Sequence, residues 1–272
     1  MLFVLFIFCI RDKYIYVFCL KMNKIKRNPT SQTWHNVANE NNVWIKWRFE
    51  VLVKSMKKIG ISLKENFECL DVGCGSNNFA TKFEEISNFK IDQVDIDPKN
   101  FKGKKLGRGT ALQYDINIRQ NSLKNKYDII FLLDVLEHIE NDDEFLQSCY
   151  FHLKKDGFLI INVPSIPELF SKYDNAVGHI RRYKKRDIKN LLKKNRYQIF
   201  LIKYWGFLLI PLLLLRKMMI NLSKQNDEET IKKGMDTQPK IIMSIISMLK
   251  YIELKFLNIS ILGSSLVSIV KK

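Results

Sequence analysis

The sequence predicts an α/β fold with a mostly parallel sheet, and three observations support this prediction. Short apolar segments alternate with helical stretches between residues 68 and 164. This alternation indicates repeated strand–helix–strand units, which place their strands parallel. Several apolar segments end in an aspartate, and one leads into a Gly-x-Gly turn. With 46% hydrophobic residues among 272, the chain can bury one large core, or one core with an elaboration.

The first strand is predicted at residues 68–72, ECLDV, with Asp71 near its end and Gly73, Cys74 and Gly75 behind it. Glycine lets a backbone approach a ligand closely, and a helix can begin directly after such a turn. Because Gly-x-Gly turns also occur without ligands, the acids at the following strand ends are needed to support a binding site.

Three further strand ends carry acids. The next strand ends at Asp95, about 20 residues past the glycines, where nucleotide-binding α/β folds place a ribose-binding acid. A short strand at residues 110–116 ends in Asp115, and the apolar run at residues 127–133 leads into Asp134. Such a continuous apolar run is typical of a parallel strand that is buried on both faces.

These segments resemble one known family. In order and spacing, LDVGCG, VDID, QYD and DVLEHI are similar to motifs of class I S-adenosylmethionine (SAM)-dependent methyltransferases, from about Trp44 to the C-terminus. The resemblance implies a Rossmann-like, doubly wound seven-stranded sheet with N-terminal helices and a helical insertion before an antiparallel last strand. Further strands are then expected at residues 157–164, 199–204 and 266–270. A glycine common in the family is replaced here by Asn77, which tolerates positive φ.

The resemblance also implies a SAM site at the carboxyl edge of the sheet. The acid and glycines after the first strand would hold the methionine end of the cofactor, and Asp95 would hold the ribose hydroxyls. Tyr114 and Asp115 would meet the adenine, and backbone around Leu133 and Asp134 would line the sulfonium side. The cofactor residues implied are Asp71, Gly73, Cys74, Gly75, Asp95, Ile96, Tyr114, Asp115, Leu133 and Asp134.

A second signature follows the fifth strand. PELFSKYD and GHIRRY, within residues 167–183, resemble a D…GHxRRY signature of bacterial methyltransferases that are often placed among glycan and lipid biosynthesis enzymes. Trp44, Trp47 and Arg48, on a helix before the first strand, are expected to close the cofactor's entrance, with simple amphipathic packing as the alternative. The residues expected to contact the acceptor or form the cap are Trp44, Arg48, Tyr173, Arg181, Arg182 and Tyr183.

Two histidines are the candidate catalytic residues, because their intrinsic pKa suits a general base near neutral pH. His138 follows the fourth strand at the edge where ligands bind, and His179 lies in the second signature. Each has a structural alternative, as a helix-start residue bonded to the backbone for His138 and as part of a turn for His179.

No metal is expected. The sequence DVLEH at residues 134–138 resembles the E-x-x-E-H cluster of quinone-ring O-methyltransferases, which bind magnesium, but an aspartate replaces the first glutamate. A single histidine is also an unusual magnesium ligand. The five cysteines are odd in number and lack CxxC spacing, which indicates a reduced, cytoplasmic protein without a zinc site.

The expected activity is SAM-dependent methylation of a small-molecule, glycan-linked or lipid-linked acceptor, in a dry pocket that aligns the reactants. The alternative is a non-catalytic SAM-binding or scaffold protein. A nicotinamide dehydrogenase is disfavoured, since Asn78 stands where G-x-G-x-x-G requires its third glycine. An RNA methyltransferase is also disfavoured, because no RNA-binding module is present and no aromatic residues are interleaved with the positive charge.

The net charge of +17 is concentrated between Arg181 and Arg196, where nine cations face the single acid Asp187. One interpretation is a solvated helix face. The other is attraction to an anionic acceptor or to acidic lipid headgroups.

The ends of the chain are predicted to be distinct from the core. The apolar runs before Met22 are shorter than the roughly 20 residues that span a bilayer, so we expect translation to begin at Met22, with a membrane-lying anchor as the alternative. The insertion before the last strand is expected to cap the active site, or to dock on a membrane. The expected division is 1–21 extension, 22–66 N-terminal helical cap, 67–205 SAM-binding core, 206–259 helical insertion and 260–272 last strand.

Overall fold

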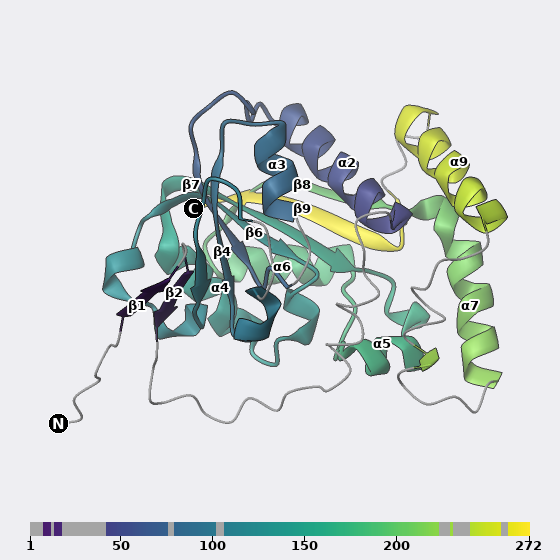
Figure 1. The fold of residues 1–272 in the computed structure, drawn as a ribbon. Coiled ribbons are helices and arrows are strands. Elements are labelled where there is room, and N and C mark those ends of the chain that lie inside the picture. The colour runs from purple at the N-terminus through teal and green to yellow at the C-terminus, as the bar shows by residue number, and fades with distance from the viewer. Residues whose placement is uncertain are drawn as a thin grey trace.

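The computed structural model describes residues 8–11, 14–17, 42–75, 79–101, 106–222, 229–230, 240–256 and 261–272. These residues form one mixed sheet with helices on both faces (Figure 1). The strands are β1 Phe8–Arg11, β2 Tyr14–Val17, β3 Glu68–Val72, β4 Lys90–Asp95, β5 Ala111–Gln113, β6 Tyr127–Leu133, β7 Leu153–Pro164, β8 Gln198–Trp205 and β9 Ser265–Lys271. The main helices are α2 Val43–Lys58, α3 Phe79–Glu85, α4 Asp142–His152, α5 Lys172–Val177, α6 Lys185–Lys194, α7 Ile210–Leu222 and α9 Lys240–Phe256. Asn77 and Asn78 lie outside the described residues.

The sheet has the predicted doubly wound arrangement. Its strand order is β1-β2-β5-β4-β3-β6-β7-β9-β8. The five strands from β5 to β7 are parallel, and β9 lies antiparallel between β7 and β8. The seven strands β3 to β9 therefore confirm the expected Rossmann-like sheet with an antiparallel last strand.

An additional hairpin extends the sheet. Strands β1 and β2 pair antiparallel with each other, and β2 pairs parallel with β5. This differs from the expectation that residues 1–21 lie outside the fold. Without the hairpin, β5 would be an edge strand with unpaired backbone groups, and an apolar segment nearby can pair with them. Residues 1–7 and 18–41, which include Met22 and the first part of the predicted N-terminal cap, lie outside the described residues.

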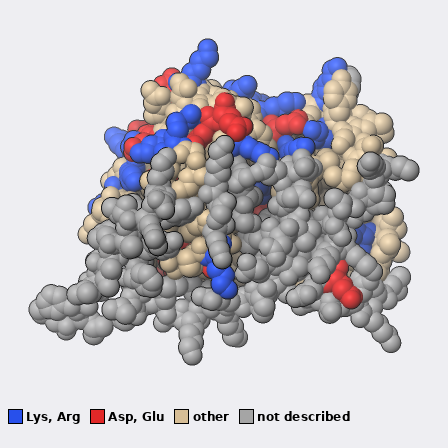
Figure 2. Space-filling model, in the orientation of Figure 1, with Lys and Arg blue, Asp and Glu red and all other residues tan. Residues whose placement is uncertain are grey.

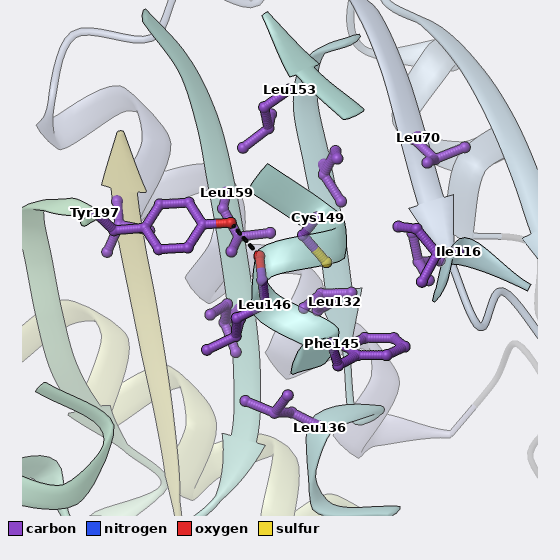
Figure 3. Close-up of a cluster of buried hydrophobic side chains, with 14 of the residues drawn as sticks. Leu70, Ile116, Leu132, Leu136, Phe145, Leu146, Cys149, Leu153, Leu159 and Tyr197 are labelled. Atoms are coloured by element: carbon purple, nitrogen blue, oxygen red, sulfur yellow. Dashed lines mark hydrogen bonds between the residues drawn. The ribbon is translucent and has the colours of Figure 1, made fainter. Parts of the chain in front are cut away.

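Alternate residues of the strands enter two separate cores. Leu70 and Leu132 face α4 and α6, whereas Cys69 and Phe131 face α2 and α3. This two-sided burial explains why the central strands are apolar throughout. In Figure 3, side chains from β3, β6, β7 and α4 meet in the first core, where the Tyr197 hydroxyl donates to the carbonyl of Leu146.

Side-chain caps set the starts of two helices next to the carboxyl edge. The Asn42 side chain accepts from the N–H of Trp44 at 2.9 Å, and α2 begins there. The Asn141 side chain accepts from the N–H of Glu144 at 3.1 Å, and three acids occupy the first turn of α4. Both features are favourable at a helix N-terminus, where free N–H groups and the helix dipole attract negative charge.

The insertion between β8 and β9 contains α7 and α9, which stand together at one end of the sheet (Figure 1). The guanidinium of Arg216 on α7 lies over the ring of Tyr173 on α5, 4.2 Å from its centroid. Glu253 on α9 accepts from the N–H of Gly206 at 2.6 Å. Among the residues that the structure describes, no helix is long and apolar enough to cross a bilayer.

Candidate active site

The carboxyl ends of the parallel strands meet at one edge of the sheet. Val72 of β3 pairs with Val94 of β4 and with Leu132 of β6. Asp95, at the end of β4, pairs with Gln113 of β5. The chain therefore leaves these strands at the same level. The acids that lie along this edge are Asp71, Asp95, Asp115 and Asp134.

The turn after β3 is held against β4. Gly73 and Gly75 have φ of +65° and +55°, a region that other residues rarely adopt. The N–H groups of Gly73 and Cys74 donate to the carbonyl of Val94 at 2.9 and 3.1 Å. The Asp95 carboxylate accepts from the N–H of Gly75 at 3.0 Å. A side chain at Gly73 would also come within 2.8 Å of the Val135 side chain, so the turn requires glycine there.

The surroundings of Asp95 fit a ribose. Its Oδ1 accepts from the N–H of Asp97 at 2.9 Å, while Oδ2 accepts from Gly75. An ionised carboxylate has about four lone-pair sites, so two remain for ligand hydroxyls. The neighbouring Ile96 exposes 40% of its surface and offers an apolar contact for a base. An adenosine group needs oxygens that accept from its ribose hydroxyls and an apolar surface beside its base, and Asp95 and Ile96 offer these two features.

The structure places Tyr114 away from the expected adenine position. Its ring is buried in the core, and its hydroxyl contacts His152 Nε2 at 2.8 Å and accepts from the N–H of Gln120 at 2.9 Å. Burial raises the pKa of Tyr114 to about 12. Asp115 is half-buried at the edge, and its Oδ1 accepts from the N–H of Asn117 at 2.9 Å. Within QYD, the buried ring of Tyr114 is therefore not placed as predicted, and Asp115 remains the predicted adenine contact.

Asp134 connects α2 to the sheet. It follows β6 directly with φ of +59°. One of its oxygens pairs with the Arg48 guanidinium, and the other accepts from the Asn162 amide at 2.5 Å. Asn162 accepts from the Trp205 indole at 2.9 Å, and the Trp44 and Trp205 ring centroids are 4.6 Å apart. Two of the three residues expected to close the entrance, Trp44 and Arg48, therefore join the last acid of the edge in one network. The third, Trp47, is fully buried in the core beneath α2 and does not line an entrance.

The GHIRRY segment ties neighbouring loops together through its charged and phenolic groups. Arg181 pairs with Asp142 at 2.9 Å, and Arg182 pairs with Asp174 at 2.8 Å. The Tyr183 hydroxyl donates to Asp142 at 3.0 Å. These predicted acceptor-binding residues have partners within the protein, so the structure gives them a role in holding this segment.

The two candidate catalytic histidines meet at the same edge. His138 lies in the short 3-10 helix η4 (Leu136–His138) after β6, and its ring centroid is 4.8 Å from that of His179. The Nδ1 of His138 contacts the carbonyl oxygen of Gly178 at 2.9 Å, and the Nδ1 of His179 contacts Asp174 Oδ1 at 2.9 Å. Because these oxygens only accept, each Nδ1 carries a proton, and Nε2 is the basic nitrogen of each neutral ring.

Glu137 lies beside this pair and is fully buried. Its Oε1 is 3.7 Å from His179 Nε2, and neither of its oxygens accepts a hydrogen bond among the residues that the structure describes. Burial, and next the charge of Asp134, raises the pKa of Glu137 well above its usual range. Burial alone would also raise the pKa of Asp174, but His179 and Arg182 outweigh it and hold that pKa at about 2.

Three residues of this edge were not predicted as site residues. Asn162 holds Asp134, Asp174 holds His179, and Glu137 lies against His179. A signal existed for each of them. Asn162 is a polar residue in an otherwise apolar strand, and the other two stand inside motifs that were already singled out.

The concentrated positive charge lies mainly on α6, which buries Ile188 and Leu192 against the core. Besides the pairs of Arg181 and Arg182 given above, two ion pairs neutralise part of it, Lys184 with Glu168 at 3.0 Å and Lys194 with Asp143 at 2.9 Å. On the face drawn in Figure 2, the visible Lys and Arg side chains lie among Asp and Glu. The remaining exposed cations fit the interpretation of a solvated helix face, and attraction to an anion stays a prediction.

The relatives of this chain are methyltransferases. Ubiquinone biosynthesis O-methyltransferase from Rickettsia bellii is 32% identical over 108 residues, 36% of this chain and 42% of the relative. The protein of that name from Pelagibacter ubique is 26% identical over 129 residues, 45% of this chain and 53% of the relative. The chain thus matches about half or less of the length of these curated relatives.

Solved structures share the fold. A SAM-dependent methyltransferase from Archaeoglobus fulgidus superposes with a TM-score of 0.50 at 19% identity, over 84% of this chain and 96% of that chain. Phosphoethanolamine N-methyltransferase 2 from Haemonchus contortus, in complex with SAM, gives a TM-score of 0.57 at 17% identity, over 90% of this chain and 57% of that chain.

A family model described as a methyltransferase domain matches residues 44–200, more than half of the chain. The matched region covers α2, the acids of the carboxyl edge and both histidines. Together with the doubly wound sheet, this match identifies the cofactor as SAM. The chain belongs to the methyltransferase-domain family and is a class I SAM-dependent methyltransferase.

Proposed function

We propose that this enzyme methylates a hydroxyl group of a small-molecule, glycan-linked or lipid-linked acceptor that binds beside His138 and His179. One observation carries the proposal. The chain runs from β6 through Asp134 to His138 without leaving the carboxyl edge, so the histidine pair and the predicted cofactor acids share that edge. The names of the O-methyltransferase relatives favour oxygen as the methylated atom.

Each group at the edge has a proposed task. SAM, when bound, supplies an electrophilic methyl group on its sulfonium. Asp71 and the glycine turn hold its methionine end, and Asp95 holds the ribose. The ion pair between Arg48 and Asp134 keeps α2 over the entrance and helps to exclude water. The acceptor hydroxyl loses its proton at the histidine pair, where His138 is the more exposed ring.

The test combines cofactor binding with product formation. The purified full-length protein is titrated with SAM by calorimetry and then incubated with SAM and a panel of acceptors that contains a catechol, a sugar and a polyprenyl phenol. We expect S-adenosylhomocysteine to form with at least one acceptor class. SAM binding without product from any of them would favour the scaffold alternative.

Two matched variants locate the cofactor. Asp95→Asn weakens acceptance of the ribose hydroxyls, and we expect the Kd for SAM to rise about tenfold, since a hydrogen bond to a charged group contributes roughly 1.5–3 kcal/mol. Asp128→Asn is the control, because Asp128 accepts from the N–H of Glu68 and pairs with Lys154 at the opposite end of the strands. Equal effects of the two substitutions would contradict the proposed site.

A lipid-linked acceptor is favoured by the surface of the insertion. We propose that α7, α9 and the segment before β9 contact a membrane surface, which makes this cytoplasmic enzyme peripherally membrane-associated. Large apolar side chains that are exposed gather there, and basic residues accompany them. The exposed apolar residues are Leu214, Leu215, Met218, Met219, Ile245, Met248, Tyr251, Ile261 and Leu262.

A further inference from the structure

Glu137, His138 and His179 form a cluster with the composition of a metal site. We propose that this cluster binds one divalent transition-metal ion of the zinc type, through a Glu137 oxygen and the Nε2 atoms of both histidines. One donor atom from each residue lies within 4.8 Å of the other two, and Glu137 Oε1 is 3.7 Å from His179 Nε2. Donors at about 2.0–2.2 Å from one zinc ion lie roughly 3.4 Å apart, so the widest separation in the cluster has to shorten by at most about 1.4 Å.

The hydrogen bonds around the histidines orient them as ligands. Metal-binding histidines commonly donate the other ring N–H to a carboxylate or a backbone carbonyl, which fixes the tautomer. His179 has such a partner in Asp174, and His138 has one in the Gly178 carbonyl, both at 2.9 Å. Asp174 is itself held by the Arg182 guanidinium at 2.8 Å. The cluster therefore presents Nε2 as the coordinating nitrogen in both rings.

Glu137 is an independent indication of a ligand. A buried carboxyl group that accepts no hydrogen bond is costly, by several kcal/mol if it is ionised. Within the described part of the chain, both Glu137 oxygens are in this condition, and the His179 ring nitrogen lies 3.7 Å from one of them. A cation bound between the carboxylate and the two imidazoles would supply the missing partner.

The donor set selects the class of metal. In the magnesium cluster that DVLEH resembles, the first acid is a ligand, but here the oxygens of Asp134 bond to Arg48 and Asn162. The magnesium arrangement therefore does not fit. His179, from a distant segment, would be the third ligand instead. The complete donor set is then two histidine nitrogens and one carboxylate oxygen. Imidazole suits zinc, cobalt or iron, whereas magnesium prefers oxygen ligands.

This site deepens the proposed function, on which its catalytic role rests, because the ion would lie where the acceptor hydroxyl binds. With zinc bound, the Nε2 atoms of both histidines coordinate the ion and no longer take the acceptor's proton. The ion would then replace the histidine base by lowering the pKa of the acceptor hydroxyl, whose proton passes to solvent. Metal binding itself is measurable without an acceptor. If zinc binds and no acceptor is methylated, the proposed function fails and the site stands. If acceptors are methylated equally fast by the metal-stripped and the zinc-loaded protein, the function stands and the site has no part in it.

The experiment uses the full-length protein after treatment with a chelator. Calorimetry with zinc chloride measures affinity and stoichiometry, and the visible absorption of added cobalt(II) reports coordination geometry. We expect one zinc ion per chain. His138→Gln and His179→Gln should each weaken zinc binding at least about tenfold. Because His138 is exposed, its substitution tests the site without disturbing the core.

Two control variants separate this site from the alternatives. His152→Gln removes a buried histidine outside the cluster, and we expect zinc affinity to change less than threefold. Asp134→Asn should likewise retain zinc, whereas a magnesium-type cluster would lose its metal. Zinc binding that is absent, or that depends on Asp134 and not on His179, would overturn the proposal. Circular dichroism confirms that each variant is folded.

Discussion

The buried acids of this enzyme differ in what surrounds them. Burial alone would raise the pKa of Asp92, but the Thr110 N–H and Lys126 outweigh it, and this pKa is lowered. Asp92 is therefore a structural carboxylate with its partners inside the protein. Glu137 is at least as deeply buried and has no hydrogen-bond donor among the described residues. Asp92 therefore stabilises the fold through partners within the protein, whereas Glu137 is the carboxyl group for which we propose a bound cation.

At the same scale, His152 should make stability depend on pH. Burial lowers its pKa, and the charges of Arg119 and Lys272 add to this effect. The ring is therefore neutral when folded but takes up a proton below about pH 6.5 when unfolded, so stability is lost as the pH falls. Between pH 7.5 and 5.5, we expect wild type to lose about 1 kcal/mol more free energy of unfolding than His152→Gln. Urea denaturation at both pH values measures the difference, and parallel losses would contradict it.

Among the elements, α2 is joined to the carboxyl edge by one ion pair, in addition to the apolar side chains that it buries against the sheet. Arg48 is almost fully buried, and its partner Asp134 is about four-fifths buried. Arg48→Met would leave a mostly buried carboxylate without its cation, and we expect a loss of about 2–3 kcal/mol in the free energy of unfolding. Asn tolerates the positive φ at position 134, so the double variant with Asp134→Asn should recover part of that loss. Chemical denaturation of the four proteins measures the coupling, and strictly additive effects would show that the pair is not coupled.

The sequence predicted the positions of those strands that are determined by a local pattern of residues. Apolar runs and strand-end acids located β3, β4, β6, β8 and β9 to within about two residues. Strand β5 is shorter than predicted, because Tyr114 turns into the core and Asp115 begins a turn. Strand β7 begins four residues earlier than predicted, directly after α4.

The contacts between distant segments could not be predicted in this way. Arg48 with Asp134, and His138 with His179, depend on how helices and loops pack over the edge, and a single sequence carries no spacing rule for such pairs. The motifs therefore indicated which strand ends carry the acids of the candidate site. They did not indicate that the ring of Tyr114 is buried, or that Glu137 lies against His179.

For the whole molecule, the insertion is the part that should decide where the enzyme works. We expect the protein to sediment with vesicles that contain phosphatidylglycerol, and less with vesicles of phosphatidylcholine alone. Leu215→Glu combined with Met219→Glu should reduce this binding at least about tenfold, because it places two charges on the exposed face of α7. Ile86→Glu is the control, as Ile86 is 47% exposed but lies after α3. Vesicle binding that survives the double substitution would instead favour α7 as a cap over the active site.

The position of β9 also sets the order in which the molecule can be completed during synthesis. β9 follows every other described element in the chain, yet it lies between β7 and β8 and, among the described strands, is the only one that pairs with β8. While residues 265–271 remain inside the ribosome, β8 has no neighbour and one side of β7 stays open. Until these residues emerge, the nascent chain therefore carries an unfinished sheet, and this is the stage at which we expect chaperones to bind it.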